Sequence, residues 1–126
     1  MSGVVVDTSV FIEYFRGKAD DSLAVLTLNN QVLLSPVVRL ELLVGLRRSE
    51  TTVVELLHSA LQVIESFPSP AECERLLRKA RGTGLFGGIP DLFIIADTLR
   101  HQATLFTYDD KMKKLAKKLG AQLLKI

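Results

Sequence analysis

Val4-Val5-Val6-Asp7-Thr8-Ser9 is the stretch that decides the fold. Three consecutive valines predict a strand buried on both faces, because β-branched side chains suit a pleated surface and none alternates out to water. The strand ends at a carboxylate, and Thr8 and Ser9 are good residues for starting the helix expected over residues 10–16. In open α/β sheets, ligands bind at the carboxyl ends of the strands. Asp7 is therefore either a ligand-binding acid or only the N-cap of that helix.

The composition of the 126-residue chain suits one domain, residues 1–126, with a single core. Hydrophobic residues make up 48% and charged residues 24%, so nothing indicates disorder. The only cysteine, Cys73, excludes an internal disulfide and a multi-cysteine zinc site, and it favours a cytoplasmic location. The sequence lacks a signal-peptide pattern and an apolar run of membrane-spanning length, so we expect no membrane partner.

Predicted strands and helices alternate along the chain. Strands are expected over residues 4–6, 32–35, 63–64, 104–107 and 122–124, and helices over residues 10–16, 22–28, 36–48, 51–61, 69–82, 91–101 and 110–119. This alternation predicts a three-layer α/β sandwich around a parallel sheet. The helix over residues 36–48 is apolar almost all round, so it should be buried in the core or against a partner. The glycine-rich loop over residues 82–90 lacks the Lys-Ser or Lys-Thr of a phosphate-binding P-loop, and we interpret it as a flexible border of the active site.

Four acids stand where their surroundings do not favour a charge. Asp7 and Asp109 each follow a predicted strand, and neighbouring strands would bring them together in the crevice at the sheet edge. Glu41 interrupts the apolar helix, where an unpaired charge is costly, and Asp91 opens a helix after the glycine-rich loop. Each acid also has a purely structural interpretation. Asp91 would then be an N-cap and Asp109 a turn residue, while Glu41 would face solvent or pair with Arg47 or Arg48.

Carboxylates that gather at one place repel one another, so such a cluster is unfavourable without a cation. Oxygen ligands without a nearby His or Cys favour a hard ion, Mg²⁺ or Mn²⁺. A metal held by carboxylates in such a crevice usually serves phosphoryl chemistry. Asp7, Glu41, Asp91 and Asp109 are therefore candidate metal ligands and catalytic residues.

Four stretches of the chain, in this order, resemble the signatures of PIN-domain nucleases. They are Val6-Asp7-Thr8-Ser9, Ser35-Pro36 leading to Glu41-Leu42 and Gly45, Pro90-Asp91 before Ile94-Ile95-Ala96, and Thr107-Tyr108-Asp109. Size and order resemble most the VapC toxins of type II toxin–antitoxin systems. The resemblance covers essentially the whole chain. It implies a parallel sheet in strand order 3-2-1-4-5.

The same resemblance implies a Mg²⁺-dependent endoribonuclease that uses Asp7, Glu41, Asp91 and Asp109 as its acidic quartet. Thr8 and Thr107 would orient a carboxylate or water from behind the metal ligands. A metal-activated water would cleave single-stranded or loop RNA, leaving a 3′-hydroxyl and a 5′-phosphate. The implied partners are a cognate antitoxin and a second copy of the toxin in a homodimer.

Three positions depart from the family pattern or leave it ambiguous. Met112 stands where the family often has an aromatic residue. Asp97 stands where a small residue is common, and because it lies off the helical face of Asp91 we expect a solvated or accessory role. Asp109 and Asp110 are adjacent, and we prefer Asp109 as the metal ligand because Asp110 suits the N-cap of the following helix.

Other interpretations remain for such a chain. A haloacid-dehalogenase-like phosphatase needs a second Asp two positions after the first, where this chain has Ser9. A receiver domain needs an Asp after its third strand, where this chain has Ser66-Phe67. A PIN fold that has lost catalysis and only binds RNA or a protein is the third alternative, and the complete quartet argues against it.

Two further features concern partners. Basic residues gather in two groups, one at Arg75, Arg78, Lys79 and Arg81 and the other at Lys111, Lys113, Lys114, Lys117 and Lys118. The second group directly follows Asp109, so it is a candidate lining for an RNA path, with Phe86 and Tyr108 as candidates for base stacking. The helix over residues 36–48 and the apolar residues Val53, Val54, Leu56 and Leu57 of the next helix predict a groove for an antitoxin segment.

Overall fold

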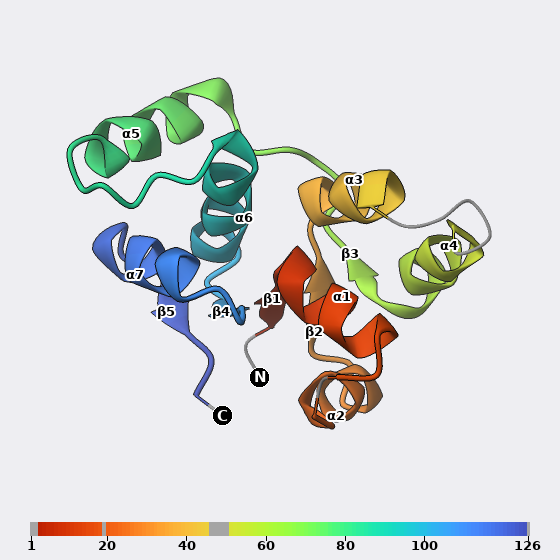
Figure 1. The fold of residues 1–126 in the computed structure, drawn as a ribbon. Coiled ribbons are helices and arrows are strands. Elements are labelled where there is room, and N and C mark those ends of the chain that lie inside the picture. The colour runs from red at the N-terminus through yellow and green to blue at the C-terminus, as the bar shows by residue number, and fades with distance from the viewer. Residues whose placement is uncertain (1–2, 19, 46–50, 126) are drawn as a thin grey trace.

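The computed structural model describes residues 3–18, 20–45 and 51–125. A five-stranded sheet in the order β3-β2-β1-β4-β5 forms its centre, which confirms the predicted strand order. The strands are β1 (Val4–Val6), β2 (Val32–Leu34), β3 (Gln62–Val63), β4 (Thr104–Phe106) and β5 (Gln122–Leu123). Neighbouring strands all pair in parallel, so their carboxyl ends lie along one edge of the sheet (Figure 1).

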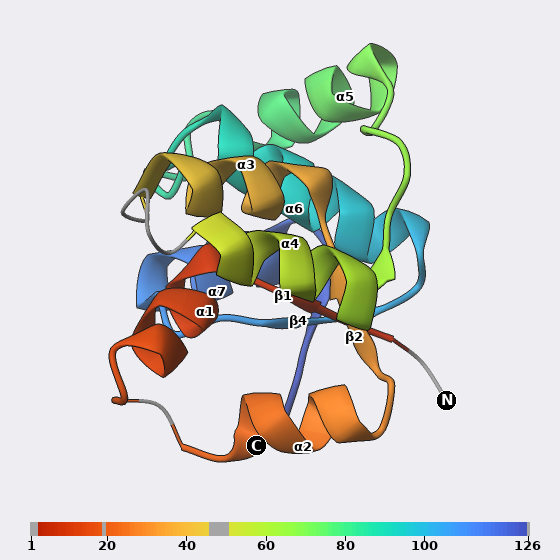
Figure 2. The same cartoon turned by 90° about the vertical axis from the view of Figure 1, so that its right-hand side faces the viewer.

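Helices cover both faces of this sheet. They are α1 (Thr8–Phe15), α2 (Ser22–Leu28), α3 (Pro36–Gly45), α4 (Thr51–Ala60), α5 (Pro70–Ala80), α6 (Ile89–Arg100) and α7 (Asp110–Lys118). Figure 2 shows the sheet between α3, α5 and α6 on one side and α2 on the other. The fold is therefore the predicted α/β sandwich.

The middle of the sheet holds the core. All three valines of β1 are buried, because β1 pairs with β2 on one side and β4 on the other while helices cover its two faces. Helix α6 contributes Leu92, Ile94 and Ile95 to the same core. No helix in the described ranges is long and apolar enough to cross a membrane.

Several element boundaries differ from those predicted. Helix α1 begins at Thr8, directly after Asp7, and β3 lies one residue earlier than expected. Helix α6 begins at Ile89 after Gly88, whose positive φ of 136° suits glycine, so Asp91 is the third residue of the helix and does not open it. The expected continuation of α3 to residue 48, and the pairing of Glu41 with Arg47 or Arg48, lie outside the described residues.

Helix α3 is buried on one side only. Val37, Val38 and Leu42 belong to the core, whereas 49% of Leu40 and 88% of Val44 is exposed. The predicted groove between α3 and α4 is wrong for Val54, which is fully buried because α4 packs against α3 within the chain. The side chain of Leu56 lies outside the described residues. The open apolar surface of α3 therefore includes Leu40 and Val44, which line a groove with Phe67 and Phe93.

Candidate active site

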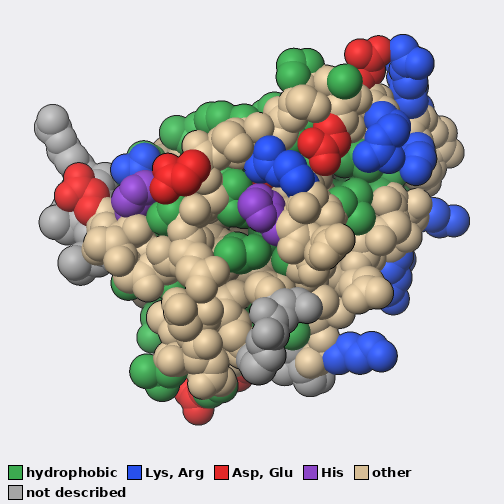
Figure 3. Space-filling model, turned by 180° about the vertical axis from the view of Figure 1, so that it is seen from behind, with side chains coloured by type: hydrophobic (Ala, Val, Ile, Leu, Met, Phe, Trp, Pro, Cys, Tyr) green, Lys and Arg blue, Asp and Glu red, His purple; other side chains and the backbone are tan. Residues whose placement is uncertain are grey.

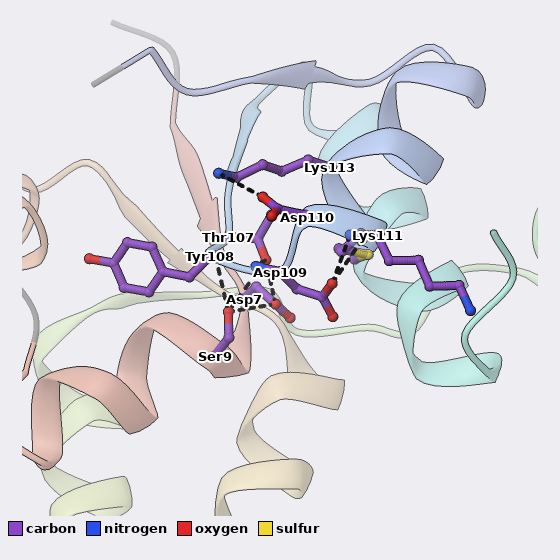
Figure 4. A network of polar contacts seen from close by, with 9 residues as sticks. Asp7, Ser9, Thr107, Tyr108, Asp109, Asp110, Lys111 and Lys113 are labelled. Atoms are coloured by element: carbon purple, nitrogen blue, oxygen red, sulfur yellow. Dashed lines mark hydrogen bonds and ion pairs between the residues drawn. The ribbon is translucent and has the colours of Figure 1, made fainter.

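Asp7 occupies the turn between β1 and α1, and two hydroxyl groups hold one of its oxygens. Its Oδ2 accepts hydrogen bonds from Ser9 Oγ at 2.9 Å and from Thr107 Oγ1 at 2.7 Å (Figure 4). Only 7% of the residue is exposed. Asp7 stands at the N-cap position of α1, but in the described structure its side chain caps no backbone N–H of that helix. The interpretation of Asp7 as only an N-cap is therefore wrong.

The same hydroxyls join the segments that follow β1 and β4. Thr107 Oγ1 accepts a hydrogen bond from the Asp109 backbone N–H at 3.1 Å, and Ser9 Oγ accepts one from the Tyr108 N–H at 3.2 Å. Because β1 and β4 are parallel neighbours, their carboxyl ends lie side by side. Asp7 and Asp109 thus belong to one connected network.

Asp109 caps helix α7. Its Oδ1 accepts hydrogen bonds from the backbone N–H groups of Lys111 at 2.9 Å and Met112 at 3.2 Å. The prediction that Asp110 is the N-cap is wrong, because Asp109 still has an extended backbone and Asp110 is the first helical residue. The Asp110 side chain is 90% exposed and lies 3.7 Å from Lys113 Nζ. Asp109 remains the candidate metal ligand for a different reason, because its negative charge contributes to the raised pKa of Asp91.

Glu41 is delivered by α3 and is half-buried. Its Oε1 accepts a hydrogen bond from Thr8 Oγ1 at 2.7 Å, across the contact between α1 and α3. The described structure therefore gives Glu41 a hydroxyl partner from the residue that follows Asp7.

The charges of the other three acids act on Asp91. Burial raises the pKa of Asp91 to about 6, and the negative charges of Asp7, Glu41 and Asp109 contribute to the rise, against a small opposite effect of Lys111. The glycine-rich loop passes close to this carboxylate, because a Cβ placed on Gly87 would lie 2.6 Å from Asp91 Oδ2. The predicted border of the site thus contacts Asp91 through a glycine that has no room for a side chain.

The acids do not form a closed metal-binding group. Within residues 3–18, 20–45 and 51–125, no three His, Cys, Asp or Glu side chains meet closely enough to hold a metal ion. The donor set nevertheless suits a hard divalent cation, since it consists of carboxylates whose mutual repulsion a cation would relieve. Asp7, Glu41, Asp91 and Asp109 are the residues that could hold it.

Sequence reasoning missed the environment of Asp97, which is fully buried rather than solvated. Ser35 Oγ donates a hydrogen bond to its Oδ2 at 2.7 Å, and Arg100 Nη2 lies 3.0 Å from its Oδ1. Burial raises the pKa of Asp97, while the Ser35 hydrogen bond and the Arg100 charge act in the opposite direction. Arg100 stands three residues after Asp97 on the same helix, and this spacing is the sequence signal that could have revealed the pair.

Comparisons with known proteins agree on the fold. The sequence model of the PIN domain matches residues 4–118. Among solved structures, FitAcB from Neisseria gonorrhoeae is similar with a TM-score of 0.66 and 19% identity, covering 97% of this chain and 96% of that one. VapBC2 from Rickettsia felis, bound to a DNA fragment from its promoter, gives a TM-score of 0.71 and 20% identity, covering 97% of this chain and 98% of that one.

VapBC-1 from nontypeable Haemophilus influenzae gives a TM-score of 0.74 and 19% identity over 96% of each chain. No curated protein sequence matched the chain. At these identities the structural likeness establishes the fold alone, whereas the match of the sequence model extends over most of the chain.

Proposed function

The chain belongs to the PIN domain family, and from this premise we propose that it is a metal-dependent endoribonuclease, the toxin of a type II toxin–antitoxin pair. The observation that carries the proposal is that the negative charges of Asp7, Glu41 and Asp109 contribute to the raised pKa of Asp91, at the carboxyl edge of the sheet. The likeness to the VapBC2 and VapBC-1 structures supports the assignment to a toxin–antitoxin nuclease family. In this proposal the whole chain is one nuclease domain that acts in the cytoplasm.

We propose that the four carboxylates hold Mg²⁺ or Mn²⁺. Such an ion, when bound, lowers the pKa of a coordinated water and offsets negative charge in the transition state. The chain's own hydroxyl groups orient the acids: Ser9 and Thr107 hold one oxygen of Asp7, and Thr8 holds one oxygen of Glu41. Asp109 is held by the first turn of α7. The hydrogen bonds of the described residues engage one oxygen of each of these three acids, and the other oxygen could coordinate the cation.

The distribution of charge supports a polyanionic substrate. Residues 70–81 and 109–118 contain nine of the 16 Lys and Arg residues but four of the 14 acids, so they carry a formal charge of +5 while the rest of the chain carries −3. These residues form α5 with its C-cap Arg81 and α7 with its N-cap Asp109, and the two helices pack against each other. Figure 3 shows Lys and Arg side chains gathered along the edge of the molecule on which Figure 1 places these two helices. A basic face beside an acidic site suits RNA, because the phosphates bind the face while one is cleaved at the acids.

The substrate in this proposal is single-stranded or loop RNA, and the products carry a 3′-hydroxyl and a 5′-phosphate. The test is cleavage of an end-labelled single-stranded RNA by the purified chain with Mg²⁺, compared with the Asp7→Asn variant and with the parent in EDTA. Cleavage should require both the metal and Asp7. Products with a 2′,3′-cyclic phosphate, or cleavage that survives full chelation, would overturn the mechanism.

A second candidate is a PIN fold that binds RNA or a protein without cleaving it. The open arrangement of the acids in the described residues favours this candidate. The same assay distinguishes the two, because RNA that binds but stays intact at saturating Mg²⁺ and Mn²⁺ would support the binding module.

The open surface of α3 is the proposed site of the antitoxin. A groove of about 430 Å³ is lined by Val37, Leu40, Val44, Gly45, Phe67, Pro90 and Phe93, with Glu41 beside them. An apolar antitoxin segment in this groove would cover Leu40 and Val44, and a Lys or Arg on it would reach Glu41 and compete with the metal. We also propose a homodimer of the isolated chain. Light scattering that gives a monomer at micromolar concentration would contradict the dimer, and full activity with saturating antitoxin would contradict the inhibitory groove.

A further inference from the structure

A second cavity lies beside the acidic site, at the carboxyl ends of β4 and β5. Its volume is about 370 Å³, within the range of about 300–1,000 Å³ common for small-molecule sites. It is lined by Asp20, Leu105, Phe106, Thr107, Tyr108, Lys113, Leu123 and Leu124. Figure 4 shows Tyr108 and Lys113 extending to one side of Asp7 and Lys111 to the other. The cavity is therefore on the opposite side of the acids from Lys111.

One residue joins this cavity to the acids. Thr107 lines the cavity, and its hydroxyl donates the 2.7 Å hydrogen bond to Asp7. The backbone of Tyr108 is fixed by Ser9, which also bonds Asp7. A molecule in the cavity would thus be separated from Asp7 by the Thr107 side chain alone.

The walls of the cavity combine three kinds of group. The Tyr108 ring meets Phe106 edge to face, with centroids 5.3 Å apart and an interplanar angle of 85°, so packing fixes its orientation. Asp20 supplies a carboxylate acceptor, and Lys113 supplies a cation that only a 3.7 Å contact to Asp110 engages in the described structure.

An aromatic face, a hydrogen-bond acceptor and a cation together suit a nucleotide. We propose that this cavity binds the nucleotide next to the scissile phosphodiester, with its base against Tyr108 and its phosphate toward Lys113. Asp20 accepts from an exocyclic amino group, so cytosine and adenine bind more tightly than uracil, which has none. The position next to the scissile bond rests on the proposed ribonuclease function, whereas nucleotide binding itself does not.

The composition of the chain allows a direct test without cleavage. The sequence contains two tyrosines and no tryptophan, so a Tyr14→Phe variant leaves Tyr108 as the only fluorophore of that kind. This variant, without added metal, is titrated with 5′-CMP, 5′-AMP and 5′-UMP. Saturable quenching is expected with CMP and AMP, with UMP binding about tenfold more weakly for want of one hydrogen bond to a charged group. A Tyr108→Phe variant, in which Tyr14 remains, is the control for absorption by the nucleotides and for binding elsewhere.

Two further results decide the proposal. The Asp20→Asn variant, in the same Tyr14→Phe background, should lose the preference for CMP over UMP while it still binds both. Equal quenching in the Tyr14→Phe and Tyr108→Phe proteins, or equal affinity for CMP and UMP in the Tyr14→Phe protein, would overturn the proposal. RNA cleavage without nucleotide binding would overturn the nucleotide site and support the ribonuclease function. Nucleotide binding without RNA cleavage would support the nucleotide site and contradict the ribonuclease function.

Discussion

Ser35 Oγ lies 2.7 Å from Asp97 Oδ2, and this hydrogen bond joins two fully buried residues, one directly before α3 and the other in the last turn of α6. Arg100 Nη2 extends the network to the backbone carbonyl of Ser66 at 2.8 Å. Helix α3 carries Glu41 and helix α6 carries Asp91. The buried pair therefore fixes the two helices that deliver two of the four acids.

Replacing Asp97 should destabilise the fold. In Asp97→Ala, the buried Ser35 hydroxyl loses its acceptor and Arg100 loses its ion-pair partner, which costs about 1–3 kcal/mol of unfolding free energy. Urea unfolding monitored by circular dichroism measures this loss. The exposed residue Asp21 provides the control, since Asp21→Asn should change stability by no more than about 0.5 kcal/mol. Equal stability of Asp97→Ala and the parent would show that the network contributes nothing.

Without a divalent cation, stability should fall as pH rises through the range set by Asp91. The folded-state pKa of Asp91 is raised to about 6 from its ordinary value of 3.8, so between these values the folded chain holds a proton that the unfolded chain releases. The favourable contribution of this proton is present below pH 3.8 and is lost as pH rises to about 6. Unfolding in EDTA at a series of pH values should show this decline, and Asp91→Asn should flatten it. An equal decline in Asp91→Asn would assign the effect to another group.

Asp7→Asn should separate activity from stability. The substitution removes one of the three negative charges that contribute to the raised pKa of Asp91, so in EDTA it should raise the melting temperature by a few degrees while abolishing RNA cleavage. Thermal unfolding and the cleavage assay are measured on the same preparation. Asp110→Asn is the matched control, because it changes a highly exposed carboxylate and should affect neither quantity strongly. A lower melting temperature together with retained cleavage would contradict the acidic cluster.

Reversing charge on α7 should weaken RNA binding in a salt-dependent way. In an Asp7→Asn background, which prevents cleavage, the triple change Lys114→Glu, Lys117→Glu and Lys118→Glu should reduce the slope of log affinity against log salt by about one for each phosphate that the variant no longer binds. Fluorescence anisotropy with a labelled single-stranded RNA measures this slope.

The control for that experiment reverses three basic residues outside α5 and α7, namely Arg16, Lys18 and Lys125. It changes the net charge by the same amount, so a weakening that depends on net charge alone would appear in both proteins. Equal slopes in the two triple variants would contradict a basic path along α7.

Gly87→Ala should disturb Asp91 more than it disturbs the fold. A Cβ at this position would lie 2.6 Å from Asp91 Oδ2, so the carboxylate must rotate away. We expect cleavage to fall at least about tenfold, with a loss of unfolding free energy below about 1 kcal/mol. Gly45→Ala is the control, because none of the described residues has an atom within 4 Å of a Cβ there. Unchanged cleavage in Gly87→Ala would show that the position of Asp91 is not critical.

The sequence predicted the sheet because the residues of β1 are typical of a buried strand. Three valines that end at an acid predict a buried parallel strand, and the resemblance to PIN-domain nucleases implied which strands lie beside it. The same resemblance implied that the strands before Asp7 and Asp109 are neighbours. It thereby brought the two acids together without side-chain detail, because the carboxyl ends of parallel neighbours must share an edge.

Sequence reasoning was wrong in two cases. One depends on which elements cover a helix, and the other depends on the exact residue at which a helix begins. The helical period separated Asp97 from Asp91, but it could not reveal that Asp97 is fully buried, because that depends on the elements that pack against α6. The choice between Asp109 and Asp110 as N-cap depends on where the backbone leaves the extended conformation. Composition does not determine that point.

The capping role of Asp109 has a genetic consequence. Asparagine caps helices as well as aspartate does, whereas alanine at an N-cap costs about 0.5–2 kcal/mol. Under the proposed function, an Asp109→Asn mutation therefore yields a folded toxin without activity, and such a protein still occupies its antitoxin. A cell that carries both alleles would have less antitoxin free to neutralise the active copy. Selection should therefore act differently on two changes at this codon, because the alanine variant loses its cap and is more readily cleared by proteolysis.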